Sequence, residues 1–442
     1  MTRAEQNDSY RAAIEFLYGL QWFGARLGLE IPRRLAALAG NPQNKLRFIH
    51  VAGTNGKGST CAMLESIYRA AGLRVGLYTS PHLVSFRERI QVNRKPISEP
   101  DVVRLVEWLK PMLAQFGPGE QPTFFEAVTI MALQYFAEQQ CELVIWETGL
   151  GGRLDATNIV TPLASVITNI QFDHQRWLGD TLAKIAAEKA GIIKPGVPCI
   201  TGAEEPEALA VIQETALLRG SQLILVTPAH TQHPPLDQLQ LPLLGWHQRM
   251  NAAVAVATVR ALQHKLPVSE SSVRTGLMTV QWPGRMQLVE VGPSKRFVLD
   301  GAHNSGGATA LRAALEEHFP EAKPTLILGV MQDKDWDLMC EILAPVAGRI
   351  ICARINSPRS ADPTKLAAAS KRTNPTAEVR TCESLADALR AAEPDQFVVV
   401  AGSLYLIGEA MELLGLVPVP NSDEKKLNEW TGNAPKPNSP KS

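Results

Sequence analysis

The 442-residue sequence predicts an α/β protein with a larger N-terminal domain and a smaller C-terminal domain, each built on a mostly parallel sheet. Short apolar runs alternate with longer helical patterns along the chain. The runs are continuously hydrophobic rather than alternating, which indicates strands that are buried on both faces. The pattern restarts near residues 283–297. A chain of this length is also too long for one compact core and suits two or three domains.

The first group of predicted elements defines the larger domain, which we place at residues 1–291. A helix is predicted from Ser59 to Ala71 and another from about Thr181 to Ala190. Buried strands are predicted at residues 47–53, 74–80, 141–148, 165–170 and 197–202. Strands that alternate with helices in this way are typical of a parallel sheet covered by helices.

The second group of elements predicts a Rossmann-like α/β domain at residues 297–419. A turn-rich Pro-Gly-Arg at 283–285 precedes a strand at 286–291 and a second strand at 296–302. Further apolar runs at 325–330, 349–355 and 396–403 are each separated by a helical pattern. From residue 420 the chain is rich in Pro, Asn, Ser and charged residues, which predicts a disordered tail at 420–442.

The composition is that of an ordinary globular protein. Hydrophobic residues make up 45%, charged residues 20%, and the formal net charge is zero, so there is no electrostatic reason to expect nucleic acid or an anionic membrane as partner. No signal peptide and no apolar run of roughly 18 residues is visible, which predicts a cytoplasmic protein. Six scattered cysteines without a CxxC pair predict reduced thiols: Cys61, Cys141, Cys199, Cys340, Cys352 and Cys382.

The most informative local motif is His50-Val-Ala-Gly-Thr-Asn-Gly-Lys-Gly-Ser-Thr60, which follows a predicted strand and opens a predicted helix. Glycines allow backbone N–H groups to converge on phosphate oxygens, and the helix N-terminus and Lys57 add positive charge. Ser59 can place its hydroxyl near Mg²⁺. The spacing GxxGKGS departs from the common GxxxxGK[ST] form. The motif predicts a P-loop NTPase-like domain that binds a nucleoside triphosphate, without specifying the reaction.

Polar residues follow three further predicted strands, at the strand ends where ligand sites of open α/β sheets concentrate. Glu147 ends one strand and leads into a glycine-rich loop at 148–155. Ser80 and the pair Asp173-His174 follow two others. Taken alone, Glu147 is as consistent with a structural role as with a functional one, and an Asp-His pair is commonly just a turn. Several such strand ends together favour a site that needs hard oxygen ligands.

Taken in order, the motifs resemble those of folylpolyglutamate and dihydrofolate synthases, which belong to the Mur ligase superfamily. The resemblance runs from about Phe16 to Leu414, although GTNGKG alone is shared with the wider superfamily. It is carried by GNPQ, IHVAGTNGKGS, YTSPHLVSFRERI, TFFEA, WETGLGGRLDATN, EKAGIIK, HQRMNAAVA, WPGRMQ, LDGAHN and GVMQDKDW. The resemblance implies ATP-dependent ligation of L-glutamate to dihydropteroate, to reduced folate (poly)glutamates, or to both, through an acyl phosphate.

The resemblance also implies roles for single residues around the nucleotide. Ser80, Glu147 and His174 look like ligands of two Mg²⁺ ions, and Lys189 matches a lysine that is carbamylated in this superfamily. The carbamate would supply an anionic oxygen ligand that an ammonium cannot. Contacts to ATP are implied for Thr54, Asn55, Gly56, Lys57, Gly58, Ser59, Thr60, Asn251, Arg285 and Asp300. Arg285 would neutralise charge on the transferring phosphoryl group.

On the substrate side, His303 and Ser403 resemble residues that contact glutamate. The folate pocket would draw on Thr123, Phe124, Phe125, Glu126, Leu154, Asp155 and Ala156, with Phe124 or Phe125 equally consistent with a core position. Lys57, Lys189, Arg285 and His303 are the catalytic residues that the resemblance implies. Two departures are visible: Ser305 stands where the family often has Pro, and LGLEIP replaces LGLERI near Arg26–Glu30.

Two alternative functions are weighed against this resemblance. Peptidoglycan-type Mur ligases carry a UDP-sugar domain before the phosphate loop, and only 52 residues precede Gly53 here. A nucleotide-dependent switch would have no need of the second domain's DGAHN or the interdomain Pro-Gly-Arg. We therefore expect ATP, L-glutamate and a pteroyl substrate as partners of a protein that is monomeric, as family members typically are.

Overall fold

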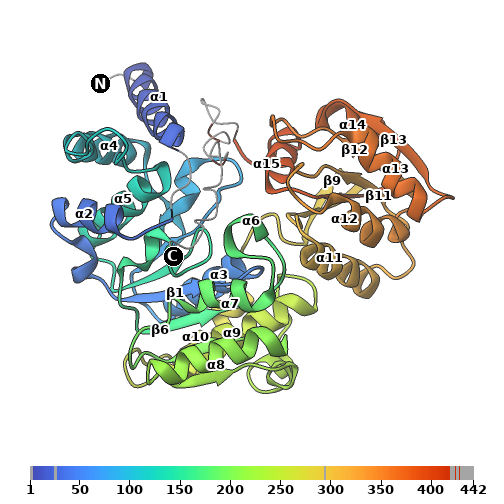
Figure 1. Ribbon diagram of the computed structural model, residues 1–442. Helices are drawn as coiled ribbons and strands as arrows, with labels where there is room; N and C mark the ends of the chain where they lie inside the picture. The colour runs from blue at the N-terminus through green and yellow to red at the C-terminus, as the bar shows by residue number, and fades with distance from the viewer. Residues whose placement is uncertain (1–2, 24–26, 293–294, 419–423, 425–427, 429–442) are drawn as a thin grey trace, which may run out of the picture.

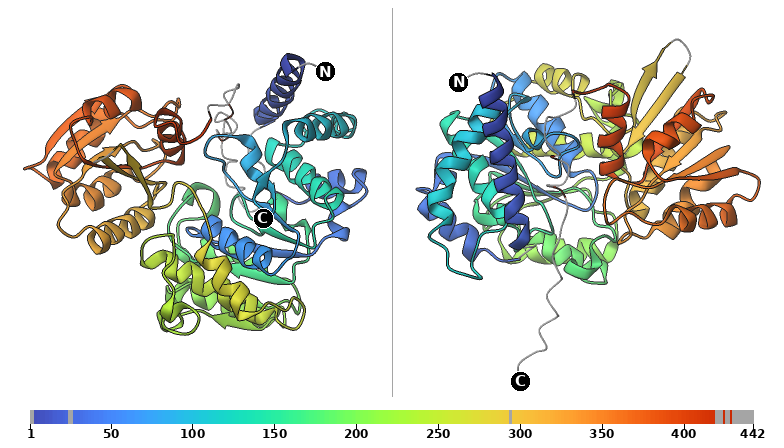
Figure 2. Two further views of the ribbon diagram at one scale, coloured as in Figure 1. Left: turned by 180° about the vertical axis from the view of Figure 1, so that it is seen from behind. Right: turned by 90° about the horizontal axis from the view of Figure 1, so that it is seen from above.

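The computed structural model describes residues 3–23, 27–292, 295–418, 424 and 428. The chain forms two α/β units, each with its own sheet (Figures 1 and 2). Two α/β units with mostly parallel sheets were predicted, and the structure confirms them. No helix in the described part of the chain is long and apolar enough to cross a membrane. The cytoplasmic location and the monomeric state stay predictions.

The first sheet has eight strands in the order β4-β3-β2-β5-β1-β6-β7-β8. Strands β3 and β4 pair in antiparallel fashion at one edge, and the other strands are parallel. The order places β1 at the centre, so the loop that follows it opens in the middle of one sheet edge. The strands are β1 (Phe48–Ala52), β2 (Val75–Tyr78), β3 (Ile90–Val92), β4 (Lys95–Pro96), β5 (Leu143–Glu147), β6 (Ala164–Ile167), β7 (Cys199–Thr201) and β8 (Leu223–Leu225).

Helices cover both faces of this sheet, as its continuously apolar strands predict. Phe48 and Trp146 face a core shared with α1, α4 and α5, whereas Ile49 and Val51 face a core shared with α3, α9 and α10. A third cluster packs β6 and β7 against α7 and α8. The helices are α1 (Arg3–Gly19), α2 (Glu30–Leu38), α3 (Lys57–Ala70), α4 (Glu99–Leu113), α5 (Phe124–Glu138), α6 (Gln175–Leu178), α7 (Leu182–Ala190), α8 (Pro206–Leu218), α9 (Trp246–Ala261) and α10 (Glu270–Met278).

The second sheet has six strands in the order β13-β12-β11-β14-β10-β9 and is parallel except for β9. Helices α11, α12 and α13 pack on one face, and α14 and α15 pack on the other. The strands are β9 (Gln287–Val291), β10 (Lys295–Asp300), β11 (Thr325–Leu328), β12 (Arg349–Ala353), β13 (Glu378–Cys382) and β14 (Phe397–Ala401). The helices are α11 (Ser305–His318), α12 (Trp336–Leu343), α13 (Pro363–Thr373), α14 (Leu385–Ala391) and α15 (Leu404–Leu413).

Two details differ from the predicted organisation. Because β9 pairs with β10, residues 287–291 lie in the second sheet rather than in the first domain, where the predicted boundary at 291 placed them. Most of the predicted disordered tail, 420–442, lies outside the described residues. Glu424 and Asn428 are described, and they are buried, with 2% and 7% exposure. These two residues therefore contradict a tail that is disordered throughout.

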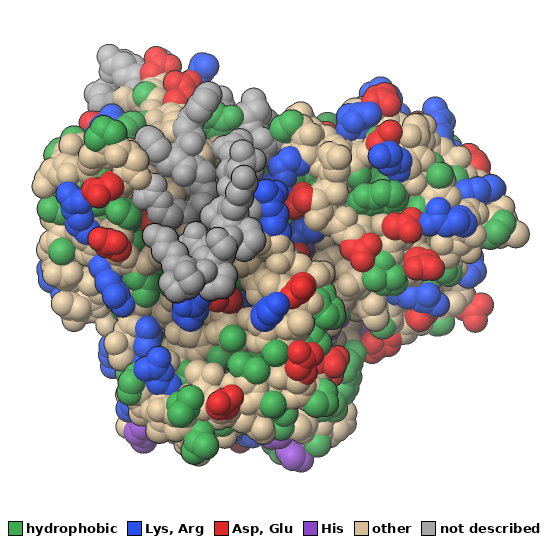
Figure 3. All heavy atoms as spheres, viewed as in Figure 1, with side chains coloured by type: hydrophobic (Ala, Val, Ile, Leu, Met, Phe, Trp, Pro, Cys, Tyr) green, Lys and Arg blue, Asp and Glu red, His purple; other side chains and the backbone are tan. Residues whose placement is uncertain are grey.

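The distribution of surface charge and the state of the cysteines agree with what the composition predicts. On the face seen in Figure 3, acidic and basic side chains are interspersed rather than gathered into one large patch of a single sign. All six cysteines are free, in agreement with the predicted reduced thiols, and all six are buried.

Candidate active site

The phosphate loop connects the central strand β1 to the N-terminus of α3. Gly56 is the residue before the helix and has a φ of 82°, a left-handed conformation that costs glycine little. A Cβ at Gly56 would also overlap the side-chain amide of Asn251, on α9. The predicted contact residues Gly56 and Asn251 are therefore neighbours, and α9 forms one wall of the loop.

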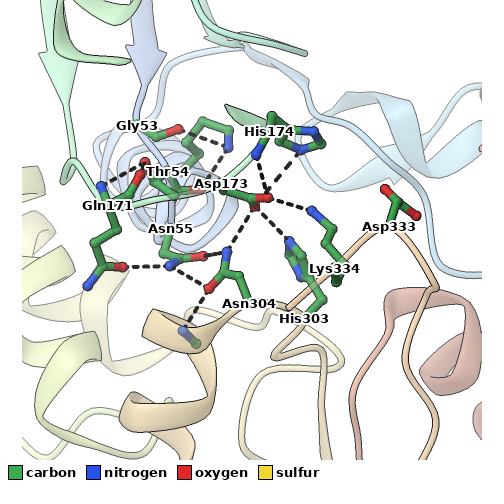
Figure 4. A network of polar contacts seen from close by, with 12 residues as sticks. Gly53, Thr54, Asn55, Gln171, Asp173, His174, His303, Asn304, Asp333 and Lys334 are labelled. Carbon is green, nitrogen blue, oxygen red and sulfur yellow. Dashed lines mark hydrogen bonds and ion pairs between the residues drawn. The ribbon is translucent and has the colours of Figure 1, made fainter. Parts of the chain in front are cut away.

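Asn55, in the same loop, links the two domains. Its backbone N–H donates to Asn169 Oδ1 (2.8 Å), and its Nδ2 donates to Gln171 Oε1 (2.7 Å) and to Asn304 Oδ1 (3.0 Å). Asn304 returns a hydrogen bond from its Nδ2 to Asn55 Oδ1 (3.1 Å). Because Asn304 caps α11 of the second domain, that domain meets the phosphate loop directly (Figure 4).

Two lysines point at the start of the loop. Lys57 Nζ donates to the carbonyl oxygens of Gly53 and Thr54, each at 3.2 Å, and Lys189 Nζ donates to Gly53 O at 2.8 Å. Lys189 is 4% exposed. Burial and then the neighbouring Lys57 ammonium lower the pKa of Lys189 to about 7. A lysine with this pKa is partly neutral near neutral pH, and only a neutral amine can react with carbon dioxide.

Glu147 lies beside the loop, because β5 is the parallel neighbour of β1. It is 3% exposed, and burial raises its pKa to about 6, against the opposing effect of the Lys57 cation. Within the described chain its carboxylate receives one hydrogen bond, from the Ser80 N–H to Oε2 at 2.9 Å, and forms no ion pair. A buried carboxylate with so few partners beside a phosphate loop fits a hard cation such as Mg²⁺.

The predicted ligand His174 lies elsewhere in the polar network. It follows β6, and its ring nitrogen Nε2 is 3.9 Å from Asp173 Oδ2. In the described chain no group of three or more His, Cys, Asp and Glu residues gathers as a ready metal site. Ser80 and Glu147 are thus brought together. His174 lies beside Asp173 and near enough to Lys189 that burial first, and then charges including this lysine, lower its pKa.

Asp173 is the centre of an interdomain cluster that the sequence did not assign (Figure 4). Lys334 Nζ donates to its Oδ1 at 2.6 Å, and Asn304 Nδ2 donates to its Oδ2 at 2.9 Å. Burial alone would raise the pKa of Asp173, but His174, Lys334 and His303 together hold it well below its usual range. The side chains of Asp173 and Lys334 are 8% and 10% exposed. The only sequence signal for Lys334 was the motif GVMQDKDW.

His303 belongs to the same cluster and has a defined tautomer. Its Nδ1 is 2.8 Å from the carbonyl oxygen of Gly301, so this nitrogen carries the proton and donates. Burial and the Lys334 ammonium lower the pKa of His303 to about 4. The ring is therefore neutral at pH 7, and Nε2, which lies 3.7 Å from Asp173 Oδ2, is left as an acceptor.

Arg285 and Asp300 lie at the junction of the domains. Asp300 is 5% exposed, and its two oxygens accept from the N–H groups of Met286 (2.7 Å) and Ala302 (2.8 Å). It therefore ties the two segments that carry Arg285 and His303. Arg285 is close enough to Asp300 and Glu147 that both raise its pKa, although burial lowers it overall. Arg285 thus lies near the buried carboxylate beside the phosphate loop.

The predicted folate residues on α5 have structural partners. Thr123 is the N-cap of α5, and its N–H and hydroxyl donate to Glu126 Oε2 at 2.7 and 2.9 Å, while Glu126 N–H donates back. This capping box explains the Thr-x-x-Glu spacing. Phe124 packs against Phe86 with ring centroids 6.3 Å apart, and Phe125 lies over Gly149.

The glycine-rich loop after β5 is organised by Asp155. Its carboxylate accepts hydrogen bonds from the N–H groups of Gly149, Leu150 and Thr157 and from the Thr157 hydroxyl. Ala156 follows it and is buried, and the Leu154 carbonyl accepts from the Gly28 N–H. A cavity of about 240 Å³ adjoins this segment and is lined by Leu27, Gly28, Glu30, Ile31, Arg34, Glu120 and Glu126. Arg26 lies outside the described residues.

The last predicted residues have clear positions. Ser59 and Thr60 are buried in the first turn of α3, and Gly58 lies against Trp282. Ser403 caps α15, where its hydroxyl accepts from the Tyr405 N–H at 3.2 Å. The hydroxyl of Ser403 therefore takes part in capping the helix, whereas the loop, Lys189, Glu147 and the Asp173 cluster form one continuous polar site.

Comparisons with known proteins agree with this architecture. Residues 51–259 match the Mur ligase middle domain, and residues 284–404 match the Mur ligase glutamate ligase domain. Dihydrofolate synthase/folylpolyglutamate synthase of Bacillus subtilis is 36% identical, over 92% of this chain and 99% of its own. Mycobacterium tuberculosis folylpolyglutamate synthase, complexed with ADP and AMPPCP, superposes with a TM-score of 0.82 at 31% identity, over 93% of this chain and 100% of that one.

A further solved structure is that of Escherichia coli FolC in complex with DHPP and ADP. It superposes with a TM-score of 0.80 at 33% identity, over 92% of this chain and 98% of that one. Identity and coverage at this level extend across both domains. The chain therefore belongs to the dihydrofolate synthase/folylpolyglutamate synthase family of Mur ligases.

Proposed function

We propose that this protein uses ATP to ligate L-glutamate to a pteroyl carboxylate, acting on dihydropteroate, on reduced folate (poly)glutamates, or on both. The observation that carries the proposal is the hydrogen-bonded pair Asn55–Asn304, which brings the second domain onto the phosphate loop. A nucleotide switch has no need of such a junction. A ligase needs it, because the nucleotide and the incoming amino acid must meet in one site.

The reaction has two steps in this proposal. The pteroyl carboxylate attacks the γ-phosphorus of ATP, and ADP leaves, which gives an acyl phosphate. The amine of glutamate then attacks the acyl carbon, and phosphate leaves as the amide forms. Lys57 and Arg285 stabilise the negative charge of the transferring phosphoryl group, since both cations lie around the loop and Glu147. The other loop residues and Asn251 position the nucleotide.

Glu147 and Ser80 are the groups that would hold a first Mg²⁺, and Glu147, His174 and a carbamate on Lys189 would hold a second. Bound there, Mg²⁺ neutralises phosphate charge and orients the phosphate oxygens. The pKa of Lys189 and its place against Gly53 support the carbamate, because an anionic ligand relieves the crowding of two cations at one carbonyl. A carbamate also supplies an oxygen where the amine can only donate.

On the amino-acid side, we assign His303 the role of accepting a hydrogen bond from the ammonium of glutamate. Its proton is held on Nδ1 by Gly301, so Nε2 is free to accept. Asp173 lies 3.7 Å away and adds negative charge that favours a cation at this place. The pteroyl group would lie towards Phe124, Phe125 and the cavity beside Glu126, with Leu154, Asp155 and Ala156 shaping the adjoining loop.

A substrate panel tests the proposal. The purified protein is incubated with ATP, Mg²⁺ and L-glutamate together with dihydropteroate, tetrahydrofolate or a UDP-sugar-peptide, and ADP release and product mass are followed. Glutamate-dependent ADP release is expected with one or both pteroyl compounds, with a product heavier by one glutamyl residue. Two results would overturn the assignment: turnover with the UDP-sugar-peptide but with neither pteroyl compound, or ADP release at a rate that does not depend on glutamate.

A further inference from the structure

The loop between β2 and β3 carries a set of contacts that the proposed mechanism does not explain. It runs from Ser80 to Arg89 and ends in the short 3₁₀ helix η3 (Phe86–Arg89). Ser80, at its start, is bonded to Glu147 of the nucleotide site. Phe86 and Arg89, at its end, lie on Phe124, with the guanidinium 5.3 Å from the ring centroid. The loop therefore borders both the nucleotide and the pteroyl side.

Asn428 is one of two residues after residue 418 that the structure describes, and it hydrogen-bonds to both ends of this loop. Its Nδ2 donates to the His82 carbonyl at 2.9 Å, and its Oδ1 accepts from Arg89 Nη2 at 2.6 Å. Arg89 Nε donates to His82 Nδ1 at 2.9 Å. One amide thus ties the beginning of the loop to its end. In the described chain no carboxylate forms an ion pair with Arg89, which is 3% exposed, so this neutral amide is one of the few partners of a buried cation.

Glu424 holds the middle of the loop. Its Oε2 accepts from the Phe86 N–H at 2.5 Å and from the Ser85 hydroxyl at 2.9 Å. Because a guanidinium can only donate, His82 Nδ1 must accept, and His82 Nε2 then donates to the Glu424 carbonyl at 2.9 Å. Tyr10 of α1 is close by: burial first, and the charge of Glu424 second, raise its pKa above its usual range.

The opposite side of the loop packs on the second domain. Val84 belongs to the apolar cluster of Leu406 and Ile407 on α15, and the Leu83 carbonyl lies so close to Gly408 that a Cβ there would overlap it. The loop is thus held between α15 and two residues that follow α15 in sequence. Glu424 and Asn428 are nearly fully buried. Removing the side chain of either residue leaves buried polar groups of the loop without that partner.

We infer that Glu424 and Asn428 are positioning residues for the reaction: by fixing loop 80–89 they set the pteroyl side of the site. The inference rests on the proposed function for its kinetic consequence but not for its structural one. Glu424 and Asn428 act through their contacts with His82, Phe86 and Arg89. Removing either side chain should therefore weaken binding of the pteroyl substrate more than binding of ATP.

The test uses the full-length protein with Glu424→Ala, Glu424→Gln and Asn428→Ala. Glu383→Ala is the control, because Glu383 is an exposed carboxylate of the second domain that pairs with Arg354. The KM of the pteroyl substrate is expected to rise about ten-fold in the two alanine variants, the effect of one hydrogen bond to a charged group. The KM of ATP should change little. Glu424→Gln keeps an acceptor for Phe86 N–H and Ser85 and should recover most of the loss.

Hydrogen exchange supplies a second readout that needs no substrate. Amides 83–89 are expected to exchange faster in Glu424→Ala than in the wild type or the control, with the other described segments unchanged. Unchanged exchange or equal rises in both KM values would overturn the inference. Faster turnover in the alanine variants would also overturn it, because Glu424 and Asn428 would then slow the reaction rather than support it. If the wild-type protein failed to glutamylate any pteroyl compound, the proposed function would fall, and the exchange result would still decide the role of Glu424.

Discussion

Lys57 is the single side chain on which phosphoryl transfer depends most in this site. We expect Lys57→Ala to lower kcat/KM for ATP in the ligation reaction by roughly 10²–10³-fold, the usual effect of removing one group that stabilises transition-state charge. The fold should persist, because within the described residues Lys57 Nζ donates to two loop carbonyls and to no other group. Lys184→Ala is the matched control, since Lys184 is an exposed helix lysine paired with Asp180. Near-normal turnover of Lys57→Ala would refute the phosphate-loop assignment.

Lys189 predicts a dependence on pH and on bicarbonate. Its pKa of about 7 means that the amine is mostly protonated at pH 6 and mostly neutral at pH 8. Carbamylation, and with it activity, should therefore rise between these values. Labelling with ¹³C-bicarbonate should give a carbamate resonance at pH 8 that is absent from Lys189→Ala. An inactive Lys189→Ala whose wild-type parent shows no carbamate would leave the lysine essential but unmodified, contrary to this account.

At the residue scale, the site residues that could be predicted from the sequence are those that belong to a recognisable local motif. Lys57, Gly56 and Glu147 were predicted because each lies at a strand end or in a glycine-rich turn. Asp173 and Lys334 could not be paired in advance, because 161 positions separate them and only the domain arrangement brings them to 2.6 Å. Thr123 and Glu126, which were predicted at the folate pocket, also form a capping box at the start of α5, and their Thr-x-x-Glu spacing is a helix-start signal that the prediction did not use.

At the scale of elements, the turn between β1 and α3 is the one that the sequence constrains most tightly. Gly56→Ala should cost about 1–2 kcal/mol for its left-handed backbone and roughly 1–3 kcal/mol more for the overlap with Asn251. Gly220→Ala is the control, because Gly220 has a φ of 58° and open space around its Cα. Urea unfolding should show a clearly larger loss for Gly56→Ala, with weaker ATP binding. Equal losses would mean that Asn251 does not enforce the glycine.

Most strands were predictable because burial on both faces leaves continuous apolar runs, as in β1, β5 and β14. The predicted boundary at 291 separated the edge strand β9 from its partner β10, since an antiparallel partner is fixed by the hairpin rather than by composition. The prediction of a disordered tail at 420–442 fails at the two residues that the structure describes there, Glu424 and Asn428. The composition of the tail predicts disorder, but Glu424 and Asn428 find buried partners on loop 80–89, and no local pattern in the sequence reveals such distant partners.

For the whole molecule, the Asp173–Lys334 ion pair and the Asn55–Asn304 pair should set the relative orientation of the two domains. We expect Lys334→Ala to broaden the distance distribution between spin labels at the exposed positions Leu217 and Glu383, and to lower kcat. The reason is that Asp173 loses its one lysine partner at the domain junction. Lys323→Ala, an exposed lysine in the same domain, should leave both unchanged. An unaltered distribution in Lys334→Ala would show that the ion pair does not hold the domains.

The central claim is that the carboxylate is activated as an acyl phosphate at the junction of the two domains. The most direct measurement supplies dihydropteroate labelled with ¹⁸O in its carboxylate, together with ATP and L-glutamate, and follows the released phosphate by mass spectrometry. If tetrahydrofolate proves the better substrate, its γ-carboxylate is labelled instead. One labelled oxygen per phosphate is expected at each turnover, because the acyl carbon gives up that oxygen when the amine displaces phosphate. Amide formation with unlabelled phosphate would contradict the claim.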